Sequence, residues 1–270
     1  MLKTRILLVV GSAIIIWVIF LLPKVVVDNE AILDESPKDS IASTESSDIH
    51  AQVPSVVLDA IHDIKAQMGE RWPKEKNAIF ADSLANLYAI AGQFDSAAWF
   101  SEEASKFFNT PESWIKAGDY YYQAYSFALD QAKQNQLADR AREFFEKVLA
   151  ANPKNLDVKT KLAMTYVSTS PMKGVTMLRE VLAEDPKNES ALLNMGMLSI
   201  QSRQYERAVE RLEELVKINP EHTQGQLLLG IAFMNTGDKG KAKQQFEKVK
   251  QMDKDPAVQA TVDSYLKDLK

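Results

Sequence analysis

ESALLNMGMLSIQSRQYERAVERLEELVKINPEH, residues 189–222, is followed directly by TQGQLLLGIAFMNTGDKGKAKQQFEKVKQMDKDP, residues 223–256. The two segments have the same length and align without a gap, so that Gly196 matches Gly230 and Ala208 matches Ala242. Apolar residues recur at matching places on either side of a short polar turn. Self-similarity at a period of this length indicates a stack of helical hairpins, because each copy is one supersecondary unit that buries its apolar face against the next.

The same period extends toward the N-terminus. Pro153, Pro186 and Pro220 are separated by 33 and 34 residues, and each follows an amphipathic helical stretch. Each of five copies also has two small residues at corresponding places, which predicts that the two helices of a hairpin approach closely there. These pairs are Ala85 with Ala97, Gly118 with Ala141, Ala163 with Gly174, Gly196 with Ala208, and Gly230 with Ala242.

On these residues the chain resembles the tetratricopeptide repeat family. The resemblance covers residues 78–256 and implies an all-α fold, a right-handed superhelical array of five antiparallel helical hairpins. Residues 53–77 predict a lead-in helix before the array, with Val57, Ile61, Ile64 and Met68 at helical spacing. Residues 257–270 predict a capping helix, which repeat arrays need because the last hairpin otherwise exposes an apolar face.

The second copy departs from the pattern by eleven added residues between Tyr121 and Ala141. Tyr122, Tyr125 and Phe127 keep helix-forming character there, so both helices are expected to be longer and to project from the array. Two interpretations stay open for this extension: a harmless lengthening of the hairpin, or a specific contact surface.

An unbroken uncharged run from Ile6 to Leu22 precedes the array. Together with the three valines that follow, this run is long enough to span a bilayer. No small-residue cleavage site follows it, so we expect residues 1–27 to be an uncleaved transmembrane anchor that precedes the array. Lys3 and Arg5 predict a cytoplasmic N-terminus and an extracytoplasmic array, which in a bacterium is periplasmic at the plasma (inner) membrane. Residues 28–52 are acidic and serine-rich, as in a flexible tether.

The family resemblance also implies a binding site, because the first helices of its repeats line a concave groove. The corresponding positions predict a groove that is apolar in its C-terminal half and rich in methionine, which suits a protein or peptide segment with apolar anchors. The alternative is that these side chains pack against the capping helix or one another. The groove residues are Asn86, Ile115, Tyr122, Met164, Leu193, Met197, Ile200, Leu227, Ile231 and Met234.

Chemistry beyond binding has little support in the sequence. There is no cysteine, and the three histidines, His50, His62 and His222, share no motif, so we expect no catalytic residue, no metal site and no cofactor. The net charge of -5 argues against a nucleic-acid partner. A carboxylate clamp like that of one tetratricopeptide subgroup is not expected either, since only Asn86 agrees with it.

The sequence therefore favours a membrane-anchored scaffold or assembly factor that binds another protein. The alternative is a holdase-type chaperone that shields apolar client segments, and an enzyme is the least favoured class. Transient binding of many unrelated clients would distinguish a holdase from a scaffold with one stoichiometric partner.

Overall fold

The computed structural model describes residues 53–68 and 73–269. The expected anchor, residues 1–27, and the expected tether, residues 28–52, lie outside the described residues. Within the described ranges, no helix combines the length and the apolar character that a membrane crossing requires.

The described residues form twelve α-helices and no strand, which confirms the all-α prediction. Short turns join the helices, so that consecutive helices run as hairpins. In chain order they are α2 (Ser55–Gln67), α3 (Lys74–Ile90), α4 (Phe94–Phe108), α5 (Pro111–Phe127), α6 (Gln131–Ala151), α7 (Leu156–Thr165), α8 (Pro171–Glu184), α9 (Glu189–Gln201), α10 (Tyr205–Ile218), α11 (Thr223–Thr236), α12 (Lys239–Met252) and α13 (Pro256–Asp268).

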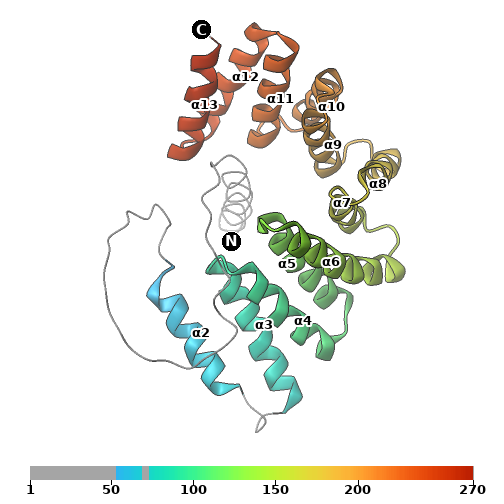
Figure 1. Cartoon of the computed structure of the whole chain (residues 1–270), viewed down its shortest axis with the longest axis vertical. Coiled ribbons are helices and arrows are strands. Elements are labelled where there is room, and N and C mark those ends of the chain that lie inside the picture. The colour runs from blue at the N-terminus through green and yellow to red at the C-terminus, as the bar shows by residue number, and fades with distance from the viewer. Residues whose placement is uncertain (1–52, 69–72, 270) are drawn as a thin grey trace.

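The helices follow one another around an open arc (Figure 1). Helices α7 and α9 lie on the inner side of this arc, and α8 and α10 lie on the outer side. Each hairpin packs mainly on the hairpins before and after it in the chain, as in a solenoid. Helix α13 packs on α12 at the C-terminal end.

The turns between successive repeats share one pattern of side-chain to backbone hydrogen bonds. In each, an Asn or Asp side-chain oxygen accepts a hydrogen bond from the backbone N–H two residues ahead, and a second side chain then caps the next helix. The first group comprises Asn152, Asp185 and Asn219; the caps of α7, α9 and α11 are Asn155, Asn188 and His222. Pro153, Pro186 and Pro220 lie exposed in these turns, where no helical N–H is needed.

The glycines in the hairpins are required for close packing, but their neighbours differ from the expected ones. A Cβ atom on Gly118, Gly196 or Gly230 would lie 2.6–2.7 Å from a large side chain of the second helix, not from a small residue. Those side chains are Phe145, Leu212 and Phe246. Only Gly174 faces its expected partner, because its Cβ would lie 2.6 Å from the carbonyl oxygen of Ala163. The small residues Ala141, Ala208 and Ala242 are fully buried in the same interfaces.

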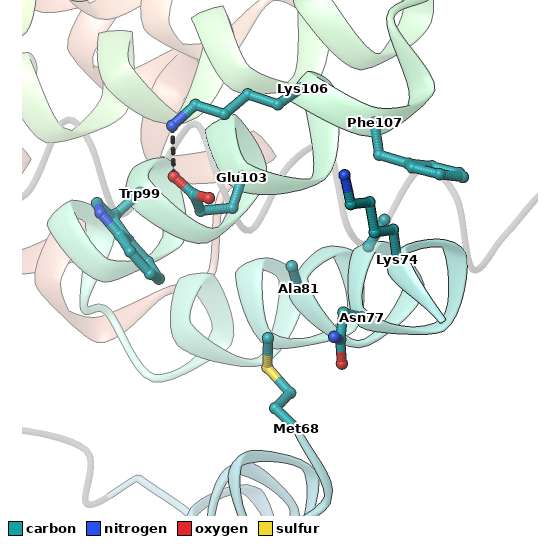
Figure 2. A pocket seen from close by; sticks show the side chains of 9 residues that line it. Met68, Lys74, Asn77, Ala81, Trp99, Glu103, Lys106 and Phe107 are labelled. Carbon is teal, nitrogen blue, oxygen red and sulfur yellow. Dashed lines mark hydrogen bonds and ion pairs between the residues drawn. The ribbon is translucent and has the colours of Figure 1, made fainter. Parts of the chain in front are cut away.

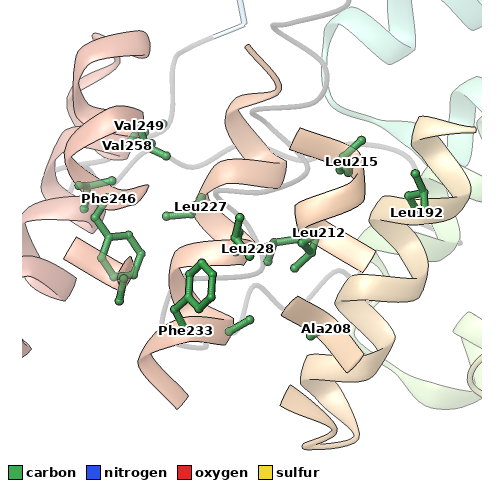
Figure 3. Packing of buried hydrophobic residues seen from close by; sticks show 14 residues of the cluster. Leu192, Ala208, Leu212, Leu215, Leu227, Leu228, Phe233, Phe246, Val249 and Val258 are labelled. Carbon is green, nitrogen blue, oxygen red and sulfur yellow. The ribbon is translucent and has the colours of Figure 1, made fainter. Parts of the chain in front are cut away.

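The largest core cluster joins the last two hairpins to the capping helix. Leu212 and Leu215 from α10, Leu227 from α11 and Phe246 from α12 are almost completely buried (Figure 3). Val258 and Val262 of α13 belong to the same cluster, and Tyr265 stacks on Phe246 with ring centroids 5.0 Å apart. Each fully buried side chain of this size contributes roughly 1.5–3 kcal/mol.

The eleven added residues lengthen α6 to 21 residues. The tip of this hairpin does not project freely, however. Phe127 stacks on Phe94, the first residue of α4, with ring centroids 4.5 Å apart. Lys133 of α6 forms an ion pair with Asp95 of α4. The added residues therefore fasten the second repeat to the first.

Candidate protein-binding site

The candidate site is the inner face of the first helices of the repeats, namely α3, α5, α7, α9 and α11. Residues four apart on a helix share one face, so each of these helices presents a short row of side chains there. The N-terminal and C-terminal halves of this face differ in chemistry.

The N-terminal half is polar, and its side chains bond across successive repeats. Lys116 of α5 lies 2.5 Å from the Asp82 carboxylate of α3, and the Tyr120 hydroxyl donates to Asn86 Oδ1 at 2.9 Å. Lys161 of α7 lies 2.9 Å and 3.1 Å from the two oxygens of Asp119 on α5. We call these contacts the polar ladder.

Burial and ion pairing in the polar ladder act in opposite directions on the pKa of the Asp119 carboxyl. Burial raises the pKa of the Asp119 carboxyl, and the adjacent Lys161 ammonium opposes this rise. Because these charges already have partners within the chain, the polar half offers few free groups to a ligand. Asn86 itself is exposed beside Tyr120, while Ile115 is half-buried.

The C-terminal half is apolar, and it is only partly open. Leu227 has 2% of its surface exposed, so its prediction as a groove residue is wrong, and it packs within the array as the alternative interpretation has it. Helices α9, α10 and α12 all pack on α11, where six consecutive residues, 225–230, are buried. Met164 of α7 is buried as well.

The other apolar residues of this half are half-buried and partly reach solvent. They pack against the core cluster that contains Leu227 and form two adjacent rows, one on α9 and one on α11. These residues are Leu193, Met197 and Ile200 on α9, and Ile231 and Met234 on α11. We call them the apolar rows.

Aromatic residues of the lengthened hairpin are occupied by contacts within the array. The ring centroids of Tyr122 and Tyr125 are 6.0 Å apart, and the Tyr125 hydroxyl lies 3.4 Å from the carbonyl oxygen of Met164 on α7. Together with the Phe127 and Phe94 stack, these contacts bind the second repeat to its neighbours.

Two partly buried polar networks were not found from the sequence. The Glu102 carboxylate of α4 accepts a hydrogen bond from the Tyr121 hydroxyl and pairs with Arg140 of α6, each at 2.5 Å. Burial alone would raise the pKa of Glu102, but the Arg140 and Tyr121 hydrogen bonds hold it below its usual value.

The second network holds the end of α7. The Arg142 guanidinium donates to the Thr165 carbonyl oxygen at 2.6 Å and lies 4.4 Å from the Tyr166 ring centroid. The only sequence signal for either network is the charge of an arginine between buried positions on α6.

Metal ligation has no support within the described ranges. These contain no group of three or more His, Asp or Glu side chains that could hold a metal ion. His62 is exposed on α2, and His222 Nδ1 accepts a hydrogen bond from the Gly225 N–H at 3.0 Å.

Comparison with known families agrees with this architecture. Two overlapping segments, residues 174–225 and 199–263, match the tetratricopeptide repeat family model. This part of the chain is made of tetratricopeptide repeats. No curated protein sequence matches the chain. Tetratricopeptide repeat proteins are generally non-enzymatic binding scaffolds.

Several solved structures are similar to the chain at low sequence identity, and the first of the three below shares its fold. TTC0263, a thermophilic protein of Thermus thermophilus, superposes with a TM-score of 0.55 at 19% identity, covering 70% of this chain and 98% of that protein. MamA from Desulfovibrio magneticus RS-1 gives 0.47 at 20% identity, with 68% and 96% covered. YrrB, described as having an unusual peptide-binding site, gives 0.44 at 18% identity, with 77% and 97% covered.

Proposed function

We propose that the chain is a membrane-anchored scaffold or assembly factor that holds a segment of a partner protein on the apolar rows. The observation that carries this proposal is the incomplete burial of Leu193, Met197, Ile200, Ile231 and Met234 on two adjacent inner helices. Apolar side chains that stay partly exposed in neighbouring repeats supply the anchors that an amphipathic helix or extended segment needs.

The proposed membrane attachment would give this binding a fixed location. Residues 6–22 carry no charge, and Lys3 and Arg5 precede them. By the positive-inside rule, this arrangement supports an extracytoplasmic location for the repeats at the plasma membrane. The tether, residues 28–52, would let the array reach a partner at some distance from the bilayer.

A second candidate function, a holdase for apolar client segments, is favoured by Met197 and Met234. Methionine is unbranched and polarisable, so two methionines in neighbouring rows can adapt to different apolar partners. The two functions differ in the number of partners, not in the surface used.

Site-specific photo-crosslinking in intact cells tests both functions. In the test variants a photoreactive residue replaces Gln201 or Asn235, which are exposed and continue the apolar rows. In the control variants it replaces Glu210 or Gln244, which are exposed on α10 and α12. The scaffold function predicts one dominant adduct from positions 201 and 235 and none from 210 and 244. Many unrelated adducts at 201 and 235 would indicate a holdase. Equal adducts from all four positions would contradict binding on the apolar rows.

A further inference from the structure

Within residues 53–68 and 73–269, the N-terminal end of the array is incompletely covered. Helix α2 packs on α3 and buries Val57 and Ile61 there, but it leaves a hollow between the C-terminal end of α2 and helices α3 and α4. The hollow has a volume of about 390 Å³ (Figure 2). Its lining residues are Met68, Lys74, Asn77, Ala78, Ala81, Trp99, Glu103, Lys106 and Phe107. We call this hollow the end cavity.

The end cavity is lined by small buried residues of α3 and by exposed aromatic residues of α4. Ala78 and Ala81 are buried and too small to fill it, whereas Trp99 and Phe107 keep 53% and 44% of their surface exposed. A volume at the lower end of the range for ligand sites holds one large side chain and the adjoining backbone, and excludes a large cofactor.

Comparison of the repeats with one another shows that the exposed indole is exceptional. Trp99 lies two residues after the small residue Ala97 of α4. The residues two places after the corresponding Ala141, Gly174, Ala208 and Ala242 are Glu143, Thr176, Glu210 and Gln244, all polar and all exposed. The repeat architecture therefore does not require an aromatic residue at this position, and exposed tryptophan is typical of contact surfaces.

Among the described residues that line the end cavity, one cation is available to a ligand. Glu103 lies 2.5 Å from the Lys106 ammonium, and the carboxylate of Glu102 is a further partner of Lys106 at 3.4 Å. Lys74, the first residue of α3, extends its ammonium group toward Phe107 (Figure 2) and has no ion pair or hydrogen bond within the described structure. A ligand with a carboxylate beside an apolar group would complement Lys74 and the aromatic edge together.

We propose that the end cavity is a second docking site, which takes one aromatic side chain of a partner protein that is flanked by acidic residues. It is formed by α2, α3 and α4 and shares no residue with the apolar rows of α9 and α11. The inference shares with the proposed function only the premise that the ligand is a protein. Either site can therefore fail its test without affecting the other.

The test uses the full chain in a lipid nanodisc and two tripeptide probes, acetyl-Glu-Phe-Glu-amide and acetyl-Lys-Phe-Lys-amide. The indole N–H signal of Trp99 in a proton–nitrogen NMR spectrum is assigned by its loss in Trp99→Phe. The acidic probe is expected to shift this signal saturably, and to bind about threefold or more tightly than the basic probe, as one exposed ion pair allows.

Charge reversal supplies the decisive variant. Lys74→Glu is expected to reverse the preference, so that the basic probe becomes the tighter one. Lys239→Glu is the matched control, because Lys239 is also the exposed first residue of its helix, and it should leave the preference unchanged. Ala81→Leu should fill the cavity and weaken the binding of both probes. If that variant folds poorly, the comparison of Lys74→Glu with Lys239→Glu still tests the inference.

An unchanged preference in Lys74→Glu would overturn the inference, and so would three further outcomes. One is equal binding of the two probes by the unmodified chain. Another is a Trp99 signal that moves with protein concentration in the absence of probe, which would assign the surface to a second copy of the chain. The third is a response to phosphatidylglycerol in the nanodisc that the probes do not produce, which would assign the aromatic edge to the bilayer.

Discussion

A Cβ atom on Gly174 would lie 2.6 Å from the backbone carbonyl oxygen of Ala163. At the other glycines in the hairpin contacts, the nearest atoms belong to side chains that can move. A backbone carbonyl cannot withdraw without shifting helix α7, so this contact fixes how closely α7 and α8 approach.

Gly174→Ala is therefore expected to destabilise the array by about 1 to 3 kcal/mol through overpacking. Thermal unfolding followed by circular dichroism measures the effect. Gly240→Ala is the control, since Gly240 lies in the first turn of α12 and its added Cβ would meet nothing closer than 3.7 Å. This control should be neutral or slightly stabilising because alanine favours the helix. Equal melting temperatures for the two variants would show that the close contact is not maintained in solution.

His222 predicts a pH dependence of stability. Burial lowers the pKa of its imidazole, while the nearby Glu189 carboxylate opposes the shift. Its Nδ1 atom caps α11 by accepting the Gly225 N–H, which it can do only when that nitrogen is unprotonated. When the pH is lowered, His222 of the unfolded chain is therefore protonated near pH 6.5, and His222 of the folded chain only at a lower pH. The free energy of unfolding consequently falls below about pH 6.5, by at most about 1.4 kcal/mol per pH unit.

His222→Asn should retain the cap and remove this pH dependence, since Asn155 and Asn188 form the same contact at α7 and α9. Urea unfolding at pH 7.5 and at pH 5.5 measures the difference. The unmodified chain should lose more stability than the variant between these two values. A similar loss in both proteins would assign the pH dependence to other groups.

Arg142 predicts a local effect at the end of α7. Arg142→Met keeps most of the apolar stem but removes the donors to Thr165 and the contact with Tyr166, so a loss of about 1 to 3 kcal/mol is expected. Hydrogen exchange should accelerate first in residues 158–165. Arg179→Met serves as control, because Arg179 is exposed on α8 and forms no ion pair within the described ranges. Uniform exchange changes along the chain would contradict a local role.

Leu227 and Leu193 are expected to differ, although they occupy equivalent places in consecutive repeats. Leu227→Ala empties a buried site and should cost about 2 to 5 kcal/mol, whereas Leu193→Ala removes a half-buried side chain and should cost clearly less. Chemical unfolding of the two variants gives the comparison. Equal costs would mean that the two inner helices are enclosed to the same degree.

The predicted anchor can be tested independently of the repeats. The full-length protein should stay in the membrane fraction after washing with salt and at alkaline pH, because a transmembrane helix is held far more firmly than a peripheral contact. Protease added outside spheroplasts should digest the repeats. Recovery in the wash would remove the anchor from the proposal, and protection of the repeats would reverse the orientation.

The sequence was sufficient for the helical hairpins because their signals are local and periodic. Gly196 and Gly230, and the prolines after each second helix, recur at nearly constant spacing. The neighbours of the glycines were harder to predict, since Leu212 and Phe246 reach them from a full helical turn beyond Ala208 and Ala242.

The candidate site was predicted less well. Leu227 was predicted to line the groove, but α11 is apolar on nearly all sides, which is typical of an enclosed helix. The contacts of the polar ladder depend on the rotation angle between adjacent repeats. This angle cannot be predicted from the repeat length. The one sequence feature that relates to these contacts is a spacing of 34 residues, which separates Asp82 from Lys116 and Asn86 from Tyr120.

The polar ladder and the apolar rows give the two ends of one array opposite responses to their surroundings. Added salt screens the partly exposed ion pairs between α3, α5 and α7, so the first three repeats gain freedom to bend relative to one another. A salting-out anion such as sulfate strengthens apolar burial and stiffens the last two repeats. We therefore expect the curvature of the arc to depend on the solution as well as on the fold, so that a long partner would bind to a more flexible end and a stiffer end of the same surface.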